Sequence, residues 1–403
     1  MKNFLLLCVL STVGLLLSAC TSEPKEEPIG SVIERGLKTA TDQALLMAKE
    51  LENQEGKLPK SMKDGKLETS DYSWWCSGFF PGELWYLYEA NPTPELKRYA
   101  ELYTARVEKA KTITNNHDVG FMLNCSYGNG YRLTGNPKYK EEVMIEGAHS
   151  LATRYNPQLG LMRSWDSDKQ KWQYAVIIDN MMNLEFLMWA GRATGDSTFT
   201  QMAISHADKT MANHFRPDYS SYHVVSYDTI TAQPHIKQTH QGYADESAWA
   251  RGQAWALYGY TMMYREAKKQ AYLEQANHIA QFLMNHPNMP ADKIPYWDFD
   301  CPDIPHTVRD ASAAAIMASA LIELSQFNPN DFGKQCLSFA EQQIRSLTSP
   351  AYLATPGTNA NFAIMHCTGH LPGNSEVDVP LSYADYYYVE ALLRLRNVLN
   401  IGR

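Results

Sequence analysis

Cysteine is scarce in this 403-residue sequence, and its few positions follow no regular framework. Apart from Cys8 and Cys20 near the N-terminus, five cysteines remain, an odd number without a CxxC pair, so their spacing does not indicate a disulfide scaffold. The stretches His366–His370 and Asp298–His306 contain candidate metal ligands, but neither has the spacing of a standard zinc site. We therefore expect no structural metal.

Positive charge is also limited, because 36 Lys and Arg residues face 44 Asp and Glu residues and give a formal net charge of -8. Without a basic stripe the chain has no means of neutralising a phosphate backbone, which excludes nucleic acid as a partner. Its 44% hydrophobic and 20% charged residues are typical of a soluble globular protein. Trp and Tyr, by contrast, are abundant in polar loop sequence, where they suit stacking on sugars.

The N-terminus carries an apolar run, Phe4–Leu17, that follows the positive charge of Lys2. The run is short for a membrane span and has the length of a signal peptide's hydrophobic region. It ends in Leu17-Ser18-Ala19-Cys20, which resembles a bacterial lipobox, where cleavage precedes a cysteine that is then acylated. A leader with a chance cysteine is the alternative interpretation.

We accordingly expect a lipoprotein signal peptide in 1–19, an acylated Cys20 with a charged tether in 20–29, and a single folded domain in 30–403. The mature protein would then be held in the envelope of a bacterium by its lipid, with no helix crossing the membrane.

Two similar turns indicate a helical repeat. Thr134–Tyr139 and Thr194–Phe199 each combine Thr-Gly, a polar residue and an aromatic residue, and each separates two segments of helical hydrophobic periodicity. Such a turn ends one helix at its glycine and begins the next. Placing helices around these and similar turns predicts an all-α fold, an (α/α)6 barrel of six helical hairpins. The expected helices are 30–54, 77–90, 94–110, 119–134, 137–154, 180–194, 197–214, 246–267, 271–286, 309–327, 331–347 and 382–399.

The connections between these helices are strongly asymmetric. Even-numbered helices lead into odd-numbered ones through a few turn residues, whereas the other connections are long. Long ordered loops in a compact domain are usually functional, and these should open together at the N-termini of the even helices, which favour an anionic ligand. The long loops are 55–76, 111–118, 155–179, 215–245, 287–308 and 348–381.

Asp118 and Asp179 stand at equivalent places, each at the start of an even-numbered helix and flanked by apolar residues. A helix N-cap is the simplest role for either aspartate. Two partly desolvated carboxylates close together should instead have separated pKa values, with one retaining a proton near neutrality, as general acid–base chemistry on a glycoside requires.

Arg251 begins a later even-numbered helix between Trp249 and Trp255. Its guanidinium could pair with a structural carboxylate, or it could hold a sugar carboxylate beside aromatic rings. In the first long loop, one of Trp74 and Trp75 could face the sugar while the other lies in the core.

Three motifs together resemble the unsaturated glucuronyl hydrolases of glycoside hydrolase family 88. They are His117-Asp118-Val119-Gly120-Phe121, Ile178-Asp179-Asn180-Met181-Met182-Asn183-Leu184 and Arg251-Gly252-Gln253-Ala254-Trp255, and the similarity spans nearly the whole mature chain. The resemblance implies an (α/α)6 barrel that removes Δ4,5-unsaturated uronic acids from lyase-generated oligosaccharides by hydrating the C4=C5 double bond, without a metal or organic cofactor.

By this resemblance Asp179 is the acid/base, and Asp118 is a second carboxylate that positions groups or stabilises charge. The residues expected to bind substrate are Trp75, His223, Thr239, Gln241, Trp249, Arg251 and Trp255. Recognition of sulfate is expected in loops 215–245 and 348–381, where the candidates are His235, Lys237 and Ser375.

Three other functions remain open at this point. The first is an unsaturated rhamnogalacturonyl hydrolase that acts on pectin fragments, and the second is an inverting hydrolase of saturated sugars on the same barrel. The third is a surface lipoprotein that binds glycans without turnover, which would need aromatic residues and arginine but no desolvated pair of carboxylates.

Overall fold

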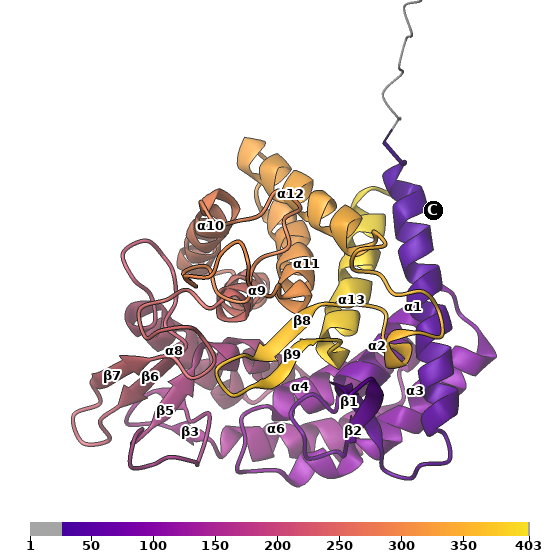
Figure 1. Cartoon of the computed structure of the whole chain (residues 1–403). Helices are drawn as coiled ribbons and strands as arrows, with labels where there is room; N and C mark the ends of the chain where they lie inside the picture. The colour runs from indigo at the N-terminus through magenta and orange to yellow at the C-terminus, as the bar shows by residue number, and fades with distance from the viewer. Residues whose placement is uncertain (1–25, 402–403) are drawn as a thin grey trace, which may run out of the picture.

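The computed structural model describes residues 26–401 (Figure 1). The predicted signal peptide, Cys20 and most of the tether lie outside these residues. Within the described part of the chain, no helix is both long enough and apolar enough to cross a membrane.

Six helical segments form the inner ring of a barrel. Neighbouring segments pack on one another around the ring, and the last returns to the first. The alanine-rich α11 is buried on all sides from Ala311 to Ile322, because small side chains allow its neighbours to approach from every direction. The segments are α2 (Phe79–Ala90), α4 (Val119–Leu123) continued by α5 (Asn129–Thr134), α7 (Leu184–Thr194), α9 (Ala250–Ala267), α11 (Ala311–Phe327) and α13 (Ser382–Val398).

The outer ring packs one amphipathic face on the inner helices. In Figure 1, α10, α12 and α1 lie outside α9, α11 and α13. Gly135 and Gly195 end α5 and α7 in the left-handed conformation that the two predicted turns require, with φ of 65° and 75°. The outer segments are α1 (Ile29–Leu51), α3 (Pro94–Arg106), α6 (Ile145–Ala152), α8 (Ser197–Asn213), α10 (Gln270–Asn285) and α12 (Asp331–Leu347). Each predicted helix has its counterpart, and the all-α barrel is confirmed.

Four of the six long connections, all except 111–118 and 287–308, contain short antiparallel strands, of which the sequence pattern indicated only the run Tyr222–Tyr227. They form three two-stranded sheets and one three-stranded sheet, β5–β6–β7. The strands are β1 (Leu58–Lys63), β2 (Lys66–Ser70), β3 (Tyr155–Asn156), β4 (Leu161–Met162), β5 (Ala175–Ile177), β6 (Val224–Tyr227), β7 (Pro234–Gln238), β8 (Cys367–His370) and β9 (Ser375–Val379).

Two inner helices depart from the predicted continuous form, one six residues after Asp118 and one at Asp179 itself. The 119–134 helix is interrupted by a π-helical turn, η2 (Asn124–Gly128), and the 180–194 helix begins with a 3₁₀ turn, η4 (Ile178–Asn183). Asn183 joins the two, because its side-chain oxygen accepts the Phe121 N–H at 2.9 Å. A Cβ on Gly120 would lie only 2.6 Å from that oxygen, so the close approach requires glycine there.

Candidate active site

A cleft of about 320 Å³ opens at the N-terminal ends of the inner helices. Five of the six long loops, or the helix starts beside them, supply its walls. The 287–308 loop contributes none of the lining residues; its Asp298 instead accepts the Tyr243 N–H at 2.9 Å and supports the fourth loop from behind. The lining residues are Trp74, Trp75, Asp118, Trp165, Ser167, Asp168, Trp172, Ile177, Asp179, His240, Gln241, Arg251, His370, Ser375, Glu376 and Tyr383.

Asp118 and Asp179 both reach this cleft, and neither side chain caps a helix. Asp118 occupies the N-cap position of α4 without a capping hydrogen bond from its side chain, and Asp179 lies inside the 3₁₀ turn η4. Burial raises the pKa of each carboxyl to about 7, far above the ordinary value of an aspartate. The separation of the two pKa values expected from the sequence is therefore absent, because both carboxyls are buried to a similar degree, and either group is able to hold or release a proton near neutrality.

A neutral histidine lies beside Asp118. The Nε2 atom of His117 is 3.4 Å from the Asp118 carboxylate, and Asn183 approaches both residues, at 3.4 Å from His117 Nδ1 and 3.5 Å from the Asp118 carboxylate. Burial lowers the pKa of His117 to about 3, so the ring carries no charge at neutral pH. Asp118 therefore forms no ion pair with His117, and this neighbour does little to stabilise the carboxylate form of Asp118.

Asp179 has a comparable neighbour in His223. The Nδ1 atom of this buried ring accepts the backbone N–H groups of His240 at 3.0 Å and Gln241 at 3.2 Å. A nitrogen that accepts hydrogen bonds carries no proton, so the ring proton of the neutral tautomer is on Nε2, which lies 3.8 Å from the Asp179 carboxylate. Burial lowers the pKa of His223, which keeps the ring neutral. The uncharged Nε2–H of His223 therefore lies near Asp179, but at 3.8 Å the two atoms form no hydrogen bond in this structure.

Arg251 lines the cleft but is largely committed to the protein. Its guanidinium pairs with Asp310 at 3.1 Å and donates to the backbone carbonyls of Thr368 and Gly369. Both interpretations of the sequence are therefore realised in part: the arginine has a structural carboxylate as partner, and it also brings a positive charge to the cleft. That charge counteracts burial by lowering the pKa of Asp179.

An aromatic wall also lines the cleft, and the sequence did not predict which residues form it. Trp165 lies 5.5 Å from Trp172 and 5.3 Å from His240 between ring centroids, and His240 lies 4.8 Å from His370. The signal in the sequence was the density of Trp and Tyr in the loops. Only the fold selects which of these rings share one wall.

The other predicted substrate-binding residues divide into two groups. Trp75 and Gln241 line the cleft, and the Gln241 amide is fixed by donating to the Gly369 carbonyl at 3.1 Å. Trp249, Trp255 and Thr239 are not part of the lining. The Trp249 ring stacks on the Arg251 guanidinium, whose Cζ atom lies 4.5 Å from the ring centroid. Trp255 is fully buried, and the Thr239 hydroxyl accepts the N–H of Gly242 at 2.7 Å. Trp249 therefore supports Arg251, Thr239 supports its own loop, and Trp255 lies beside Asp179, whose pKa its indole N–H lowers. Their contact with the sugar stays a prediction.

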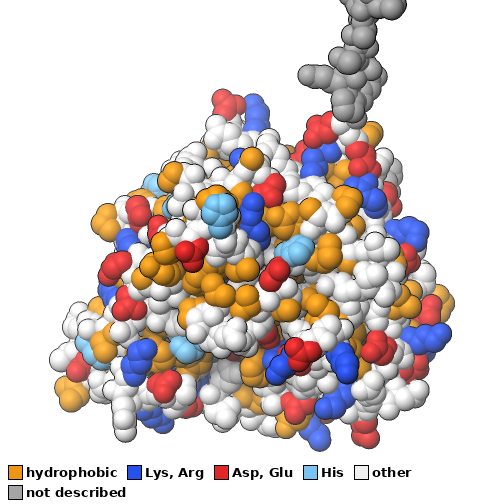
Figure 2. Space-filling view, in the orientation of Figure 1, with side chains coloured by type: hydrophobic (Ala, Val, Ile, Leu, Met, Phe, Trp, Pro, Cys, Tyr) orange, Lys and Arg blue, Asp and Glu red, His pale blue; other side chains and the backbone are white. Residues whose placement is uncertain are grey.

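The residues predicted to recognise sulfate also divide into two groups. Ser375 lines the cleft, whereas the exposed His235 and the Lys237 that packs on Tyr222 belong to β7, away from it. Among residues 26–401, no group of three or more His, Cys, Asp or Glu side chains is arranged to hold a metal ion. The face of the molecule in Figure 2 mixes acidic and basic side chains without an extended basic area.

The fold and the cleft have counterparts among known proteins. The family model described as Glycosyl Hydrolase Family 88 matches residues 47–390. An unsaturated glucuronyl hydrolase of Formosa agariphila is 46% identical over 325 residues, which cover 81% of this chain and 80% of the relative. An unsaturated chondroitin disaccharide hydrolase of Streptococcus pneumoniae is 31% identical, with 84% of this chain and 86% of the relative covered.

Solved structures agree with these relatives. A crystal structure of an unsaturated glucuronyl hydrolase specific for heparin has a TM-score of 0.89 and 47% identity. The match covers 92% of this chain and 98% of the chain in that structure. The crystal structure of the unsaturated glucuronyl hydrolase of Bacillus sp. GL1 has a TM-score of 0.83 and 28% identity, and the match covers 91% of this chain and 100% of the GL1 chain. The resemblance carried by the three motifs is confirmed, and the chain belongs to Glycosyl Hydrolase Family 88.

Proposed function

We propose that this enzyme removes Δ4,5-unsaturated uronic acids from the non-reducing ends of oligosaccharides that polysaccharide lyases produce, such as glycosaminoglycan disaccharides. The main support for this function is the pair Asp118 and Asp179. Both are buried carboxyls with pKa values of about 7, and both line a cleft whose walls contain tryptophans. The family membership and the names of the relatives support the same substrate class.

The chemistry is the hydration of a vinyl ether. Protonated Asp179 gives its proton to C4, and a water molecule that loses a proton to the resulting carboxylate adds its oxygen to C5. The product is a hemiketal at C5, which opens to a ketone and leaves a hemiacetal at C1 that expels the partner sugar. Asp179 ends the cycle protonated again, so one group serves as acid and then as base.

The surrounding residues support these proton transfers. The neutral His223 directs its Nε2–H at Asp179 and stabilises the carboxylate that forms without fixing a permanent charge beside it. Asp118 stabilises the positive charge that develops on the sugar after C4 is protonated. Arg251 and the N-terminal ends of the inner helices attract the substrate carboxylate, and the tryptophan wall packs against the ring.

We also propose that the chain is a lipoprotein of the bacterial envelope, anchored through Cys20, with the signal peptide in 1–19 and the catalytic domain in 30–403. The support is the lipobox-like Leu17-Ser18-Ala19-Cys20 after an apolar run of signal-peptide length. Cys20→Ser should move the protein from the membrane fraction to the soluble fraction and abolish incorporation of labelled palmitate. An unchanged distribution would contradict the anchor.

The activity is tested by following the ultraviolet absorbance of the conjugated C4=C5 bond. Unsaturated disaccharides from chondroitin, hyaluronan, heparin and pectin should each be incubated with the protein, and the released partner sugar measured. Loss of absorbance with stoichiometric release supports hydration. Activity on the pectin fragments alone would favour the rhamnogalacturonyl alternative, whereas cleavage of saturated sugars alone, or binding without turnover, would contradict the proposal.

A further inference from the structure

A second cavity of about 400 Å³ lies at the opposite end of the barrel axis from the cleft. Its outer walls come from the C-terminal halves of inner helices, with Arg132 on α5, Trp189 on α7 and Arg394 on α13, and its inner end reaches Phe121 and Tyr387 in the N-terminal halves of α4 and α13. We refer to it as the distal cavity.

Aromatic rings separate the distal cavity from the cleft. Phe121 packs on Trp255 with ring centroids 5.3 Å apart, and Trp255 packs on Tyr387 at 5.5 Å. Phe121 and Tyr387 line the distal cavity, while Trp75, 5.7 Å from Phe121, lines the cleft. The two hollows therefore have different walls and can bind different molecules.

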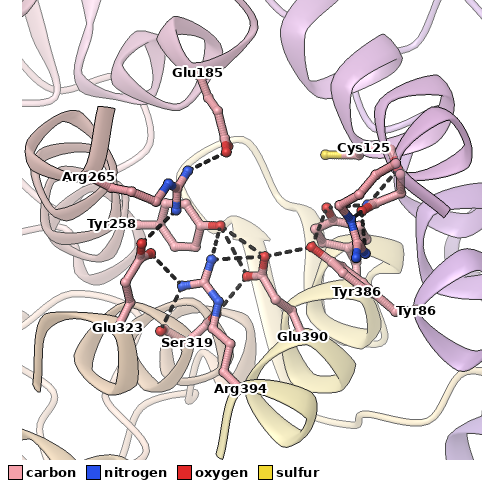
Figure 3. A network of polar contacts seen from close by, with 12 residues as sticks. Tyr86, Cys125, Glu185, Tyr258, Arg265, Ser319, Glu323, Tyr386, Glu390 and Arg394 are labelled. Carbon is pink, nitrogen blue, oxygen red and sulfur yellow. Dashed lines mark hydrogen bonds and ion pairs between the residues drawn. The ribbon is translucent and has the colours of Figure 1, made fainter. Parts of the chain in front are cut away.

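Two charged side chains in the walls of the distal cavity, Glu390 and Arg394, are already paired (Figure 3). Glu390 accepts from Arg394 at 3.2 Å and from the hydroxyls of Tyr86 and Tyr258 at 2.7 and 3.0 Å. Arg394 also pairs with Glu323 at 2.9 Å. Because each of these charges has its partner, this part of the wall does not require a charged ligand.

The rim of the distal cavity is neutralised in the same way. Arg132 pairs with Glu89 at 2.6 Å, Arg192 pairs with Glu266, and the Glu185 carboxylate pairs with Arg265. These ion pairs leave polar edges of the guanidinium and carboxylate groups facing the hollow. Such edges suit hydroxyl groups, which both donate and accept hydrogen bonds.

Several neutral polar groups in the distal cavity lack a protein partner. Among the side-chain hydrogen bonds of residues 26–401, none involves the Asn124 amide, the Tyr387 hydroxyl or the Trp189 indole N–H, although all three side chains line the hollow. Asn124 belongs to the π-helical turn η2, and such turns are frequent at functional sites. The turn thus presents an unsatisfied amide toward the space.

We propose that the distal cavity binds a neutral mono- or disaccharide. Trp189 and Tyr131 stand nearly perpendicular in its lining, with centroids 6.5 Å apart, and the aromatic surface that Phe186 does not cover suits the C–H surface of a sugar. The Asn124 amide and the Tyr387 hydroxyl then meet its hydroxyl groups, and the volume is in the range of small-molecule sites. The paired charges disfavour a uronate, so the distal cavity selects a ligand class different from that of the catalytic cleft.

Ligand-observed saturation-transfer NMR on the intact wild-type protein tests this site, with N-acetylglucosamine and maltose as neutral probes and glucuronate as the anionic one. We expect saturable binding of at least one neutral sugar and binding of glucuronate that is at least about tenfold weaker. Trp189→Ala and Asn124→Leu should each weaken the neutral sugar at least about tenfold while the protein keeps its turnover of unsaturated disaccharide. Trp74→Ala, which removes an exposed tryptophan of the cleft, is the matched control and should leave this binding unchanged.

Two results would overturn the proposal. One is the absence of saturable binding for both neutral sugars. The other is binding that Trp74→Ala removes and that both distal variants retain, because the sugar would then occupy the catalytic cleft. Asn124→Leu keeps the test decisive if Trp189→Ala fails to fold, since Asn124 makes no side-chain hydrogen bond within residues 26–401 that the substitution would break.

Discussion

His223 Nε2 lies 3.8 Å from the Asp179 carboxylate, while Nδ1 of the same ring accepts the backbone N–H groups of His240 and Gln241. One neutral ring therefore connects the proposed acid to a loop that lines the cleft. Its hydrogen bonds to the loop determine which nitrogen carries the proton, and hence what Asp179 meets.

His223→Ala should lower kcat by about tenfold or more, because the Asp179 carboxylate loses the N–H that faces it. KM should rise as well, since two backbone N–H groups that position Gln241 lose their acceptor. Steady-state kinetics on an unsaturated disaccharide measure both. His235→Ala on the exposed edge of β7 is the control, and equal kinetics for the two variants would contradict the role of His223.

Asp179→Asn should reduce kcat by about a thousandfold or more with the fold retained, because an amide cannot deliver a proton to C4. The absorbance assay measures the rate, and circular dichroism checks the fold. Asp378→Asn, at an exposed carboxylate paired with His366 outside the cleft, should keep wild-type activity. Near-normal turnover by Asp179→Asn would mean that another group is the acid.

The rate should depend on pH through Asp179. Its pKa of about 7 means that the acid form predominates below neutrality and is lost as the pH rises through that value. We therefore expect kcat to fall about tenfold per pH unit well above pH 7. A profile of kcat between pH 5 and 9 tests this, and a constant rate up to pH 9 would rule out an acid with this pKa.

The same burial should make stability depend on pH through Asp118. The folded-state pKa is about 7, above the unfolded value of about 3.9, so its favourable contribution is complete below about pH 4 and is lost as the pH rises through about 7. Asp118→Asn should thus be more stable than wild type at pH 8, by on the order of 1–3 kcal/mol for a side chain 12% exposed. Urea unfolding at pH 8 and pH 4 should show a difference that disappears at the lower pH.

Arg251→Lys should destabilise the protein by about 2–4 kcal/mol, because lysine cannot replace a guanidinium that bridges Asp310 and two carbonyls, and Asp310 is left buried without its partner. Urea unfolding measures the loss. Arg345→Lys on the outer helix α12, where the arginine pairs with Glu341, should change stability by less than about 1 kcal/mol. Similar losses for both variants would contradict the bridging role.

The sequence was sufficient to predict the barrel and to place the two aspartates at one end of it. Helical periodicity and the glycines of the Thr-Gly turns are local signals, and Gly135 and Gly195 occupy the left-handed positions that those turns require. Asp118 and Asp179 were placed at one end of the barrel because consecutive hairpins of one handedness repeat the same geometry. The interruptions of two helices at η2 and η4 were not predicted, because over a few residues hydrophobic periodicity does not distinguish an α-helical turn from a π or 3₁₀ turn.

Sequence alone determined the helices, the turns and the candidate acids, because these depend on neighbours within a few positions along the chain. Tertiary structure alone decided the chemistry of each candidate. It raised both aspartate pKa values by burial, occupied Arg251 with Asp310 and two carbonyls, and moved Trp249 and Trp255 behind the cleft while bringing Trp165 and His240 to its wall. Desolvation and hydrogen bonding act between residues distant in sequence, so no local pattern records them.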